Sequence, residues 1–225
     1  MPYKILLTIL LLILPSFAFS EINYGIKGGV SINNQVATDE HLNIFLGSDV
    51  RDIFNSEFYR GQYGLFIATD IFPRLSIQPE LFYAQRGSYH SLSSPEKIEI
   101  EIKLDYIEVP ILVKYTIIPL GEKSGLNLFM GPYIAFNISS EKREKTLNGE
   151  TNRELTNTKS LDYGLVLGMS AEFGLFDGRF IIDIRSNIGM AESMSRIEGS
   201  IPIYEEPSDP SIYNFSGSVL IGYMF

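Results

Sequence analysis

Eight segments of this chain alternate between apolar and polar residues, and each alternation continues for 11 to 13 residues. A two-residue period is typical of a β-strand whose two faces meet different surroundings. Strands of globular proteins usually have about 5–6 residues, whereas a tilted strand that crosses a membrane needs about 9–11. The lengths therefore favour membrane-spanning strands. The predicted strands are 22–32, 62–72, 75–86, 105–117, 126–138, 161–173, 179–190 and 213–225.

The connections between these segments alternate between long and short. In chain order they have 29, 2, 18, 8, 22, 5 and 22 residues. A soluble sandwich has no reason to place every long loop at one end, whereas an outer-membrane barrel has short periplasmic turns and long outer loops. We therefore expect an all-β fold: an eight-stranded antiparallel up-and-down transmembrane β-barrel with short periplasmic turns and long extracellular loops.

The N-terminus has the organisation of a secretory signal peptide. Lys4 supplies a positive charge, residues 5–14 form an apolar run, and small residues precede a cleavage site after Ser20. The alternative is a membrane anchor, but a run of about ten residues is too short to cross a bilayer as a helix. We expect residues 1–20 to be removed, which leaves 21–225 as one barrel domain in the outer membrane of the cell.

Composition excludes several classes of protein. Hydrophobic residues make up 45% of the chain, which is too many for a disordered protein. The absence of cysteine excludes disulfides, thiolate zinc sites and cysteine nucleophiles. Lysine and arginine total 18 against 27 aspartate and glutamate residues, and the formal charge of −9 argues against a nucleic-acid partner.

Aromatic residues gather at both ends of the apolar face, with aliphatic residues between them. This order matches two water–lipid interfaces on either side of a hydrocarbon layer, and a soluble core has no cause to sort its rings in this way. The apolar face is therefore predicted to point outward, toward lipid. The expected girdle residues are Tyr24, Tyr63, Tyr83, Tyr115, Phe136, Tyr163, Phe173, Phe180, Tyr213, Phe215, Tyr223 and Phe225.

The opposite, polar face would line the barrel interior. Its charged groups cannot remain unpaired at low dielectric, and an eight-stranded barrel is just wide enough for side chains to fill. We therefore expect ion pairs to plug the interior and leave no open pore, with small residues on the same face making room for long charged side chains. The predicted ion-pair network comprises Lys27, Glu80, Arg86, Asp105, Glu108, Lys114, Asp162, Asp183 and Arg185.

Two features fit this prediction badly. Pro79, Pro110 and Pro132 lie inside predicted strands, where a missing N–H interrupts the hydrogen-bond ladder, and we expect bulges to absorb them. Residues 98–104 alternate with a parity opposite to that of the strand that follows. We interpret them as the same strand continuing beyond the lipid, with a bulge near Leu104 that restores the register.

Several segments, taken in order, resemble the PorT-like outer-membrane β-barrel family of Bacteroidota. The resemblance implies an eight-stranded outer-membrane barrel and no catalytic motif, and the family's prolines fall where those of this chain fall. The last strand, which ends in Tyr223 and Phe225, also resembles the C-terminal signal read by the barrel-assembly machinery. The segments are YGIKGGVSIN (24–33), SIQPELFYAQRG (76–87), LDYIEVPILVKY (104–115), LNLFMGPYIAF (126–136), DYGLVLGMSAEFG (162–174) and RFIIDIRSNIGM (179–190).

Candidate chemical sites are few. His41 and His90 are the only histidines and both fall in predicted outer loops, where an outer-membrane acyltransferase or protease would place a histidine beside serine or aspartate. No nucleophile motif accompanies them, so we favour solvated bystanders. The acidic residues of loop 33–61 lack the spacing of a calcium loop. The glycines of Gly25-x-x-Gly28-Gly29 precede no helix, so they do not form a phosphate-binding loop. No catalytic, cofactor or metal site is predicted.

The segment 139–160 carries mixed charge and few apolar residues, and we interpret it as a solvated, mobile loop with a hairpin tip at Asn148-Gly149. Its Lys142, Arg143, Lys145 and Arg153 suggest contact with anionic lipopolysaccharide, but interleaved glutamates weaken that reading. The expected partners are outer-membrane lipid and lipopolysaccharide, the assembly machinery, and an unidentified protein at the outer loops. The leading hypothesis is a non-enzymatic barrel with a structural or surface-interaction role. The alternatives are a component of a secretion or transport system, and an enzyme that uses the loop histidines.

Overall fold

The computed structural model describes residues 22–37, 59–92, 98–121, 123–146, 149–155, 158–194 and 212–225. None of these residues belongs to a helix long and apolar enough to cross a membrane. The predicted signal peptide over residues 1–20 lies outside the described residues, as does most of the acidic segment 33–61.

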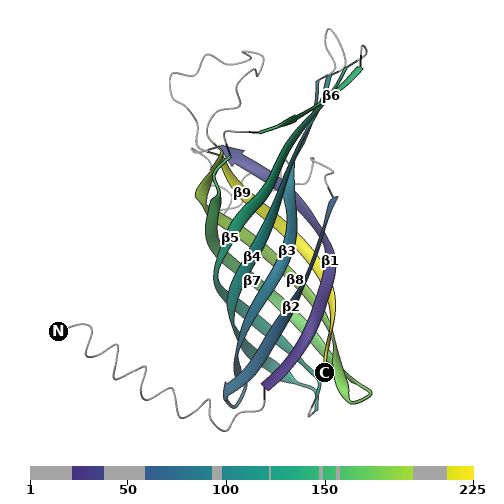
Figure 1. The fold of residues 1–225 in the computed structure, drawn as a ribbon. Coiled ribbons are helices and arrows are strands. Elements are labelled where there is room, and N and C mark those ends of the chain that lie inside the picture. The colour runs from purple at the N-terminus through teal and green to yellow at the C-terminus, as the bar shows by residue number, and fades with distance from the viewer. Residues whose placement is uncertain are drawn as a thin grey trace, which may run out of the picture.

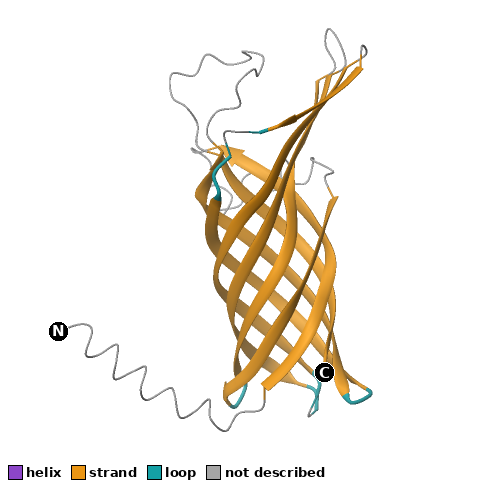
Figure 2. Ribbon diagram, viewed as in Figure 1, coloured by secondary structure: helices purple, strands orange, loops and turns teal. Residues whose placement is uncertain are grey.

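The described residues form nine β-strands, and they account for all eight predicted strands (Figures 1 and 2). The ninth, β6, is short and follows directly on the hairpin after β5. The strands are β1 (Ile22–Ala37), β2 (Tyr59–Phe72), β3 (Leu75–Leu92), β4 (Ile98–Pro119), β5 (Gly125–Thr146), β6 (Gly149–Glu154), β7 (Leu161–Leu175), β8 (Gly178–Met194) and β9 (Ile212–Met224).

Eight of these strands close into a barrel. The sheet order is β4-β3-β2-β1-β9-β8-β7-β5-β6, every pairing is antiparallel, and an additional pairing of β4 with β5 joins the two sides. β6 is outside this closed set, because it pairs with the end of β5 only. The predicted fold, an eight-stranded antiparallel barrel, is confirmed.

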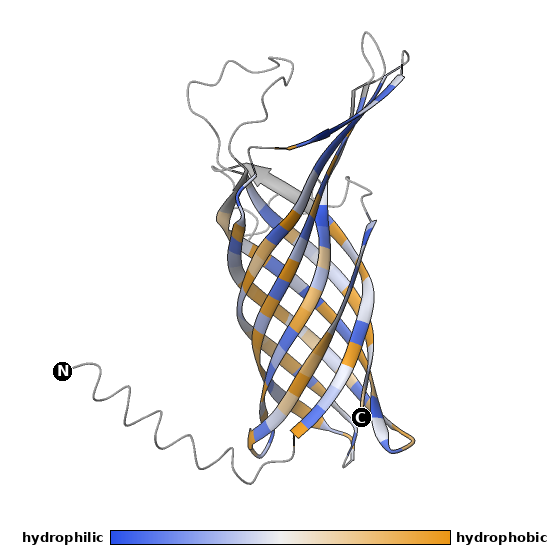
Figure 3. Cartoon of the chain, viewed as in Figure 1, coloured by the Kyte–Doolittle hydropathy of each residue, from blue (hydrophilic) through white to orange (hydrophobic). Residues whose placement is uncertain are grey.

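The two faces of the barrel wall have opposite polarity. In β5, residues alternate between buried and exposed from Gly125 to Phe136, so that Phe129 and Tyr133 point inward while Met130 is 56% exposed. Orange and blue segments alternate along the strands in the same way (Figure 3). The barrel therefore exposes a continuous apolar belt far larger than a water-soluble monomer presents.

Short turns join the strands at one end of the barrel, at residues 73–74, 120–124 and 176–177. β1 starts and β9 ends there as well, because the Phe225 amide donates a 2.9 Å hydrogen bond to the Tyr24 carbonyl. This end is called the short-turn end below. At the opposite end, strands β3 to β6 continue past the barrel rim.

Two of the predicted long loops are largely strand. β3 continues to Leu92 and β4 begins at Ile98, so the predicted 18-residue connection shrinks to residues 93–97. The interpretation of 139–160 as a mobile loop is likewise wrong, since β5 runs to Thr146 and pairs with β6 from Gly149. The outermost pair of β5 and β6 joins Thr146 and Gly149, and Asn148 of the predicted tip lies outside the described residues. Cross-strand charge pairs, described below, stabilise these extensions.

The predicted bulge near Leu104 lies instead in the neighbouring strand. The register between β4 and β5 shifts where Asp105 pairs with Ser139 and Tyr106 pairs with Asn137, which leaves Ile138 of β5 unpaired. β4 keeps its own parity, so Ile102 and Leu104 point inward together with Tyr106 and are buried. Beyond the lipid the outside is water, and apolar side chains are then more stable on the inner face.

The three strand prolines produce no bulge. β3 and β4 pair at Pro79–Ile111 and next at Phe82–Glu108, in an unchanged register. The β4–β5 pairing likewise skips two positions after Pro110 without a shift. A proline therefore removes ladder hydrogen bonds locally, and the hydrophobic pattern keeps the register because a one-residue slip would turn apolar side chains into the polar interior.

Candidate functional site

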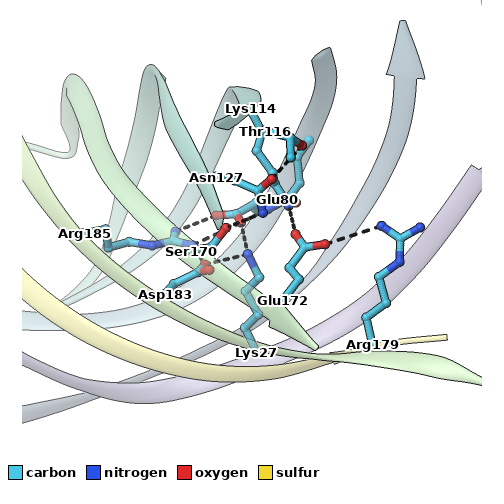
Figure 4. A network of polar contacts seen from close by, with 11 residues as sticks. Lys27, Glu80, Lys114, Thr116, Asn127, Ser170, Glu172, Arg179, Asp183 and Arg185 are labelled. Atoms are coloured by element: carbon cyan, nitrogen blue, oxygen red, sulfur yellow. Dashed lines mark hydrogen bonds and ion pairs between the residues drawn. The ribbon is translucent and has the colours of Figure 1, made fainter. Parts of the chain in front are cut away.

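Four charged side chains form a ring of ion pairs inside the barrel, in the half nearer the short-turn end (Figure 4). Lys27 Nζ lies 3.1 Å from Glu80 Oε1 and 2.6 Å from Asp183 Oδ2. Arg185 contacts the same two carboxylates, each at 2.6 Å. None of the four side chains is more than 2% exposed. Gln78 donates a further hydrogen bond to Glu80 at 2.7 Å, and the ring joins three strands, β1, β3 and β8, across the interior.

A second group leads from this ring toward the short-turn mouth. Lys114 Nζ lies 2.7 Å from Glu172 Oε1, and Arg179 lies 3.4 Å from the other oxygen of Glu172. The Arg179 side chain is 29% exposed. It lines a polar recess of about 490 Å³ at the mouth, together with Glu172 and Asn127. The recess therefore ends at a charge pair and does not continue as an open channel.

A third group fills the half of the interior farther from the short turns. Arg86 pairs with Glu108 and, at 2.8 Å, with Asp162. Two asparagines complete the shell: Asn187 donates to Glu108 at 2.6 Å, and Asn214 donates to Asp162 at 2.9 Å. Both carboxylates thus accept from an arginine and from an amide, which is how a buried charge is tolerated.

The charges of these three groups balance. Each cation among Lys27, Arg86, Lys114, Arg179 and Arg185 contacts at least one carboxylate, and five carboxylates take part: Glu80, Glu108, Asp162, Glu172 and Asp183. Each group joins strands distant in the sequence. The interior charges therefore cross-link the barrel wall and occupy its centre.

Asp105, which we expected in this network, lies elsewhere. In the antiparallel register of β3 and β4, Arg86 lies opposite Leu104, and both side chains point inward. The neighbouring positions, Gln85 and Asp105, also lie opposite each other, and their side chains are on the outer face. There Asp105 accepts a 3.2 Å hydrogen bond from Gln85 and lies 3.6 Å from Lys103 Nζ. The inclusion of Asp105 was a parity error, since only even-numbered residues of this part of β4 point inward.

Inward aromatic rings pack beside these charges, and their role was not predicted from the alternation pattern. The Arg185 guanidinium lies 5.3 Å from the ring centres of both Phe82 and Phe129. A Cβ added at Gly168 would lie 2.5 Å from the Phe129 ring, so the glycine is needed for this close approach. The small inward residues therefore accommodate rings as well as long charged side chains. Their sequence signal is a glycine paired across strands with an inward aromatic residue.

An apolar cluster lies inside the barrel next to the Arg86 group. Tyr106, Leu112 and Val166 are fully buried there. The cluster continues into the extended strands through Ile102 and Leu104. The expectation of an interior filled by ion pairs thus omitted these apolar residues, which share the inward parity with the charged ones.

The predicted girdle residues occupy the outer surface of the barrel. Tyr24 and Phe225 form a tilted ring pair at 5.5 Å near the short-turn end, and Tyr63 and Tyr83 form another at 5.2 Å near the opposite end. Between the two ends lie exposed aliphatic side chains such as Leu65, which is 58% exposed. The remaining girdle residues, each exposed or half-buried, are Tyr115, Phe136, Tyr163, Phe173, Phe180, Tyr213, Phe215 and Tyr223.

Four strands project beyond the barrel as a sheet that we call the blade, comprising residues 87–92, 98–104, 139–146 and 149–154 (Figure 1). Its outer face carries residues of opposite charge in directly paired positions of β4 and β5. These pairs are Glu99 with Lys145, Glu101 with Arg143, and Lys103 with Glu141. Cross-strand pairs of this kind favour one register.

Further contacts fix the blade at its edge and its base. Arg143 Nε lies 3.2 Å from Glu150 of β6, and Arg60 of β2 lies 2.5 Å from Glu101. Where the chain returns to the barrel, the Leu155 amide donates a 3.0 Å hydrogen bond to the Ser140 carbonyl. The blade is therefore an ordered extension of the wall, with charged groups on the surface it presents to water.

The structure describes the side chain of neither histidine. His41 lies outside the described residues, and His90 belongs to β3 but its side chain is not described. The part of the chain that the structure describes contains no cluster of acidic and histidine side chains that could hold a metal ion.

Together, the closed antiparallel wall, the exposed apolar belt, the aromatic ends and the charge-filled interior define a membrane-spanning β-barrel with a plugged interior. The chain belongs to the outer membrane protein beta-barrel domain family, whose model matches residues 15–195. The family places the protein in the outer membrane. No curated protein matches the sequence.

Three solved structures are similar to the chain at low identity. The attachment invasion locus protein Ail of Yersinia pestis is 12% identical, with 91% of this chain and 99% of that chain covered and a TM-score of 0.40. OprG from Pseudomonas aeruginosa is 10% identical, with 92% and 97% covered and a TM-score of 0.49. Neisserial surface protein A is 13% identical, with 89% and 95% covered and a TM-score of 0.41.

Proposed function

We propose that this protein is a non-enzymatic outer-membrane barrel that presents the blade to a partner outside the cell. The observation that carries the proposal is the blade itself, a charge-paired sheet that continues the wall beyond the lipid belt. A strand extension of this length exceeds what the membrane requires. Its ordered charged surface offers fixed positions for a complementary partner.

The filled interior supports an interaction role over a transport role. The three ion-pair groups and the apolar cluster occupy the space that a solute would need, and buried charge pairs are costly to separate. The enzyme alternative would use His41 and His90, and no contact among the described residues supports it. The alternative role in a secretion or transport system, and membership of the PorT-like branch, remain predictions from the sequence.

The proposal includes the orientation and biogenesis of the protein. The short-turn end faces the periplasm and the blade faces the outside, as expected for a barrel whose two termini lie at the same end. Residues 1–20 direct export and are cleaved. Tyr223 and Phe225 at the end of the last strand serve the assembly machinery as well as the girdle. Lipopolysaccharide surrounds the outer rim.

Deletion of the blade hairpin tests this function. Residues 141–154 are replaced by Asn-Gly, a turn that suits the ends because Leu155 already bonds to Ser140. Wild-type protein, crosslinked through the blade in native outer membranes, is expected to capture a protein that the shortened barrel does not. The matched control, Arg143→Lys, keeps the blade and its charge pairs. The function is refuted if the shortened barrel captures the same proteins as the wild type.

A further inference from the structure

β6 forms an open edge of the blade. It is the last strand of the sheet, and among the described residues it pairs with β5 only. All six of its residues, Gly149–Glu154, are exposed. An edge strand leaves a row of backbone N–H and C=O groups without a sheet partner, and such a row is a template for a further strand.

The register of β5 and β6 identifies the backbone groups that face this open edge. The Leu155 amide donates to the Ser140 carbonyl. This pair lies in the same register as the pair of Arg153 with Lys142. Bonded and non-bonded pairs alternate along an antiparallel ladder, so the backbone groups of Arg153 also point toward β5. The intervening residues, whose N–H and C=O groups point away from β5, are Glu150, Asn152 and Glu154.

The side chains of these residues extend two rows of charge across the outer face of the blade. In one row, Glu99, Lys145 and Glu150 lie in paired positions of β4, β5 and β6. In the other row, Lys103 is followed by Glu141 and then by Glu154. Both rows therefore end in a glutamate at the open edge.

These two edge glutamates can accept a cation from a further strand. Glu154 is exposed and lies opposite Glu141, and in the described part of the chain no cation lies at ion-pair distance from Glu154. Like charges in paired positions are destabilising, so a cation beyond Glu154 would stabilise this row. Glu150 lies 3.2 Å from Arg143 and still has a side chain that is 47% exposed. The edge therefore fits a strand with basic residues opposite Glu150 and Glu154.

A second copy of β6 does not provide such a strand. A symmetric antiparallel pairing centred on Asn152 would place Glu150 of each copy opposite Glu154 of the other. A pairing centred on Thr151 would place no opposite charges in paired positions. Charges on an edge strand commonly prevent association of this kind. The same two glutamates thus disfavour a like edge and favour a basic one.

We propose that the open edge of β6 binds an extended, basic segment of a partner protein, which adds a fifth strand to the blade. Lysine or arginine residues at positions i and i+4 of the segment pair with Glu150 and Glu154. Its backbone bonds to the outward groups of these residues and of Asn152. In this mode of recognition main-chain hydrogen bonds give affinity and side chains give specificity. The inference rests on the proposed function, because it assigns the partner of the blade to a chemical class.

Two labelled peptides of about eight residues probe the charge of the edge in the purified barrel in detergent. One peptide alternates lysine with threonine, the other alternates glutamate with threonine, and fluorescence anisotropy measures each Kd. The wild type should bind the lysine peptide at least about tenfold more tightly. Glu154→Lys should lower this preference at least about tenfold. A loss of folding would instead weaken the binding of both peptides.

A pair of substitutions at one position probes the backbone of the edge. Asn152→Pro removes one outward N–H, a change that an edge strand tolerates, and Asn152→Ala is the matched control that keeps this N–H. Neither changes the charge, so a merely electrostatic attraction to this acidic protein would leave both variants with the same affinity. Asn152→Pro should bind the lysine peptide about tenfold more weakly than Asn152→Ala. Hydrogen exchange of the Arg153 amide, which bonds to β5, checks that β6 stays paired. If proline releases β6, the charge reversal at Glu154 still decides.

Equal affinity of the wild type for the two peptides overturns the edge site. Equal affinity of Asn152→Pro and Asn152→Ala, with β6 still paired, does the same. A wild-type barrel that sediments as a dimer in detergent, and as a monomer after Asn152→Pro, would make the occupant a second copy, and the proposal would be wrong. If the site fails while deletion of residues 141–154 still abolishes partner capture, the partner binds the face of the blade, and the proposed function stands without this inference.

Discussion

Arg86 holds two carboxylates that no other cation in the described residues contacts at ion-pair distance. Both Glu108 and Asp162 are deeply buried, and their remaining partners are neutral amides and a tyrosine hydroxyl. Removing the cation would leave two negative charges facing each other at low dielectric. Burial of unpaired charge is among the most destabilising changes a side chain can cause.

We therefore predict that Arg86→Met lowers the free energy of unfolding by about 3–5 kcal/mol. Urea unfolding in detergent micelles, followed by far-ultraviolet circular dichroism, measures the change. Adding Glu108→Gln and Asp162→Asn to the same variant should restore most of the stability, because the charges disappear together. A triple variant as unstable as the single one would show that packing around Arg86, and not charge, is responsible.

A substitution at Arg74 is expected to stabilise the barrel. It occupies the third position of the turn between β2 and β3 with φ at 73°, directly after Pro73. Proline followed by a positive φ is typical of a type II turn, which favours glycine at that position. Arg74→Gly should therefore raise the free energy of unfolding by about 1 kcal/mol, the usual cost of a side chain in this conformation. If Arg74→Gly unfolds at the same urea concentration as the wild type, the backbone at Arg74 is not strained.

At the scale of elements, the blade depends on charges in adjacent strands. Lys145 of β5 pairs with Glu99 on one side and with Glu150 of β6 on the other. Lys145→Glu would place three negative charges in one row, and like charges in paired positions cost roughly 0.2–1 kcal/mol each. We expect faster hydrogen exchange of the β6 amides with unchanged exchange in β8. Equal protection of β6 in both proteins would mean that backbone pairing alone stabilises the blade.

At the scale of the whole molecule, the apolar belt needs a lipid-like environment and the interior leaves no pore. The folded barrel should migrate differently on a denaturing gel before and after boiling, and it should need detergent to stay monomeric. In planar bilayers we expect no large, steady conductance, because the three charge groups and the Tyr106 cluster fill the interior. Sustained openings of constant size would contradict the plugged interior.

Much of the architecture follows from local pattern. Alternation fixed the number and order of the spanning strands, because each strand separates lipid from a polar interior along its whole length. The same pattern identified the carboxylates and cations that point inward, with the exception of Asp105, which has the wrong parity. Within the blade, the strand at 98–104 was predicted, whereas the strands at 139–146 and 149–154 were not, because they lie in water, where charged residues resemble a loop in composition.

The sequence by itself determined which residues face lipid and that the chain closes as a barrel, since a period of two and long strands allow few other arrangements. Only the tertiary structure decided which charges pair, because Lys27, Glu80 and Asp183 come from three distant strands. It also decided that Ile138 is the bulge and that Ile102 and Leu104 turn inward. These features depend on whether lipid or water lies outside the wall and on which side chains fill the inside at each level of the barrel. The alternation of apolar and polar residues along the sequence does not contain that information.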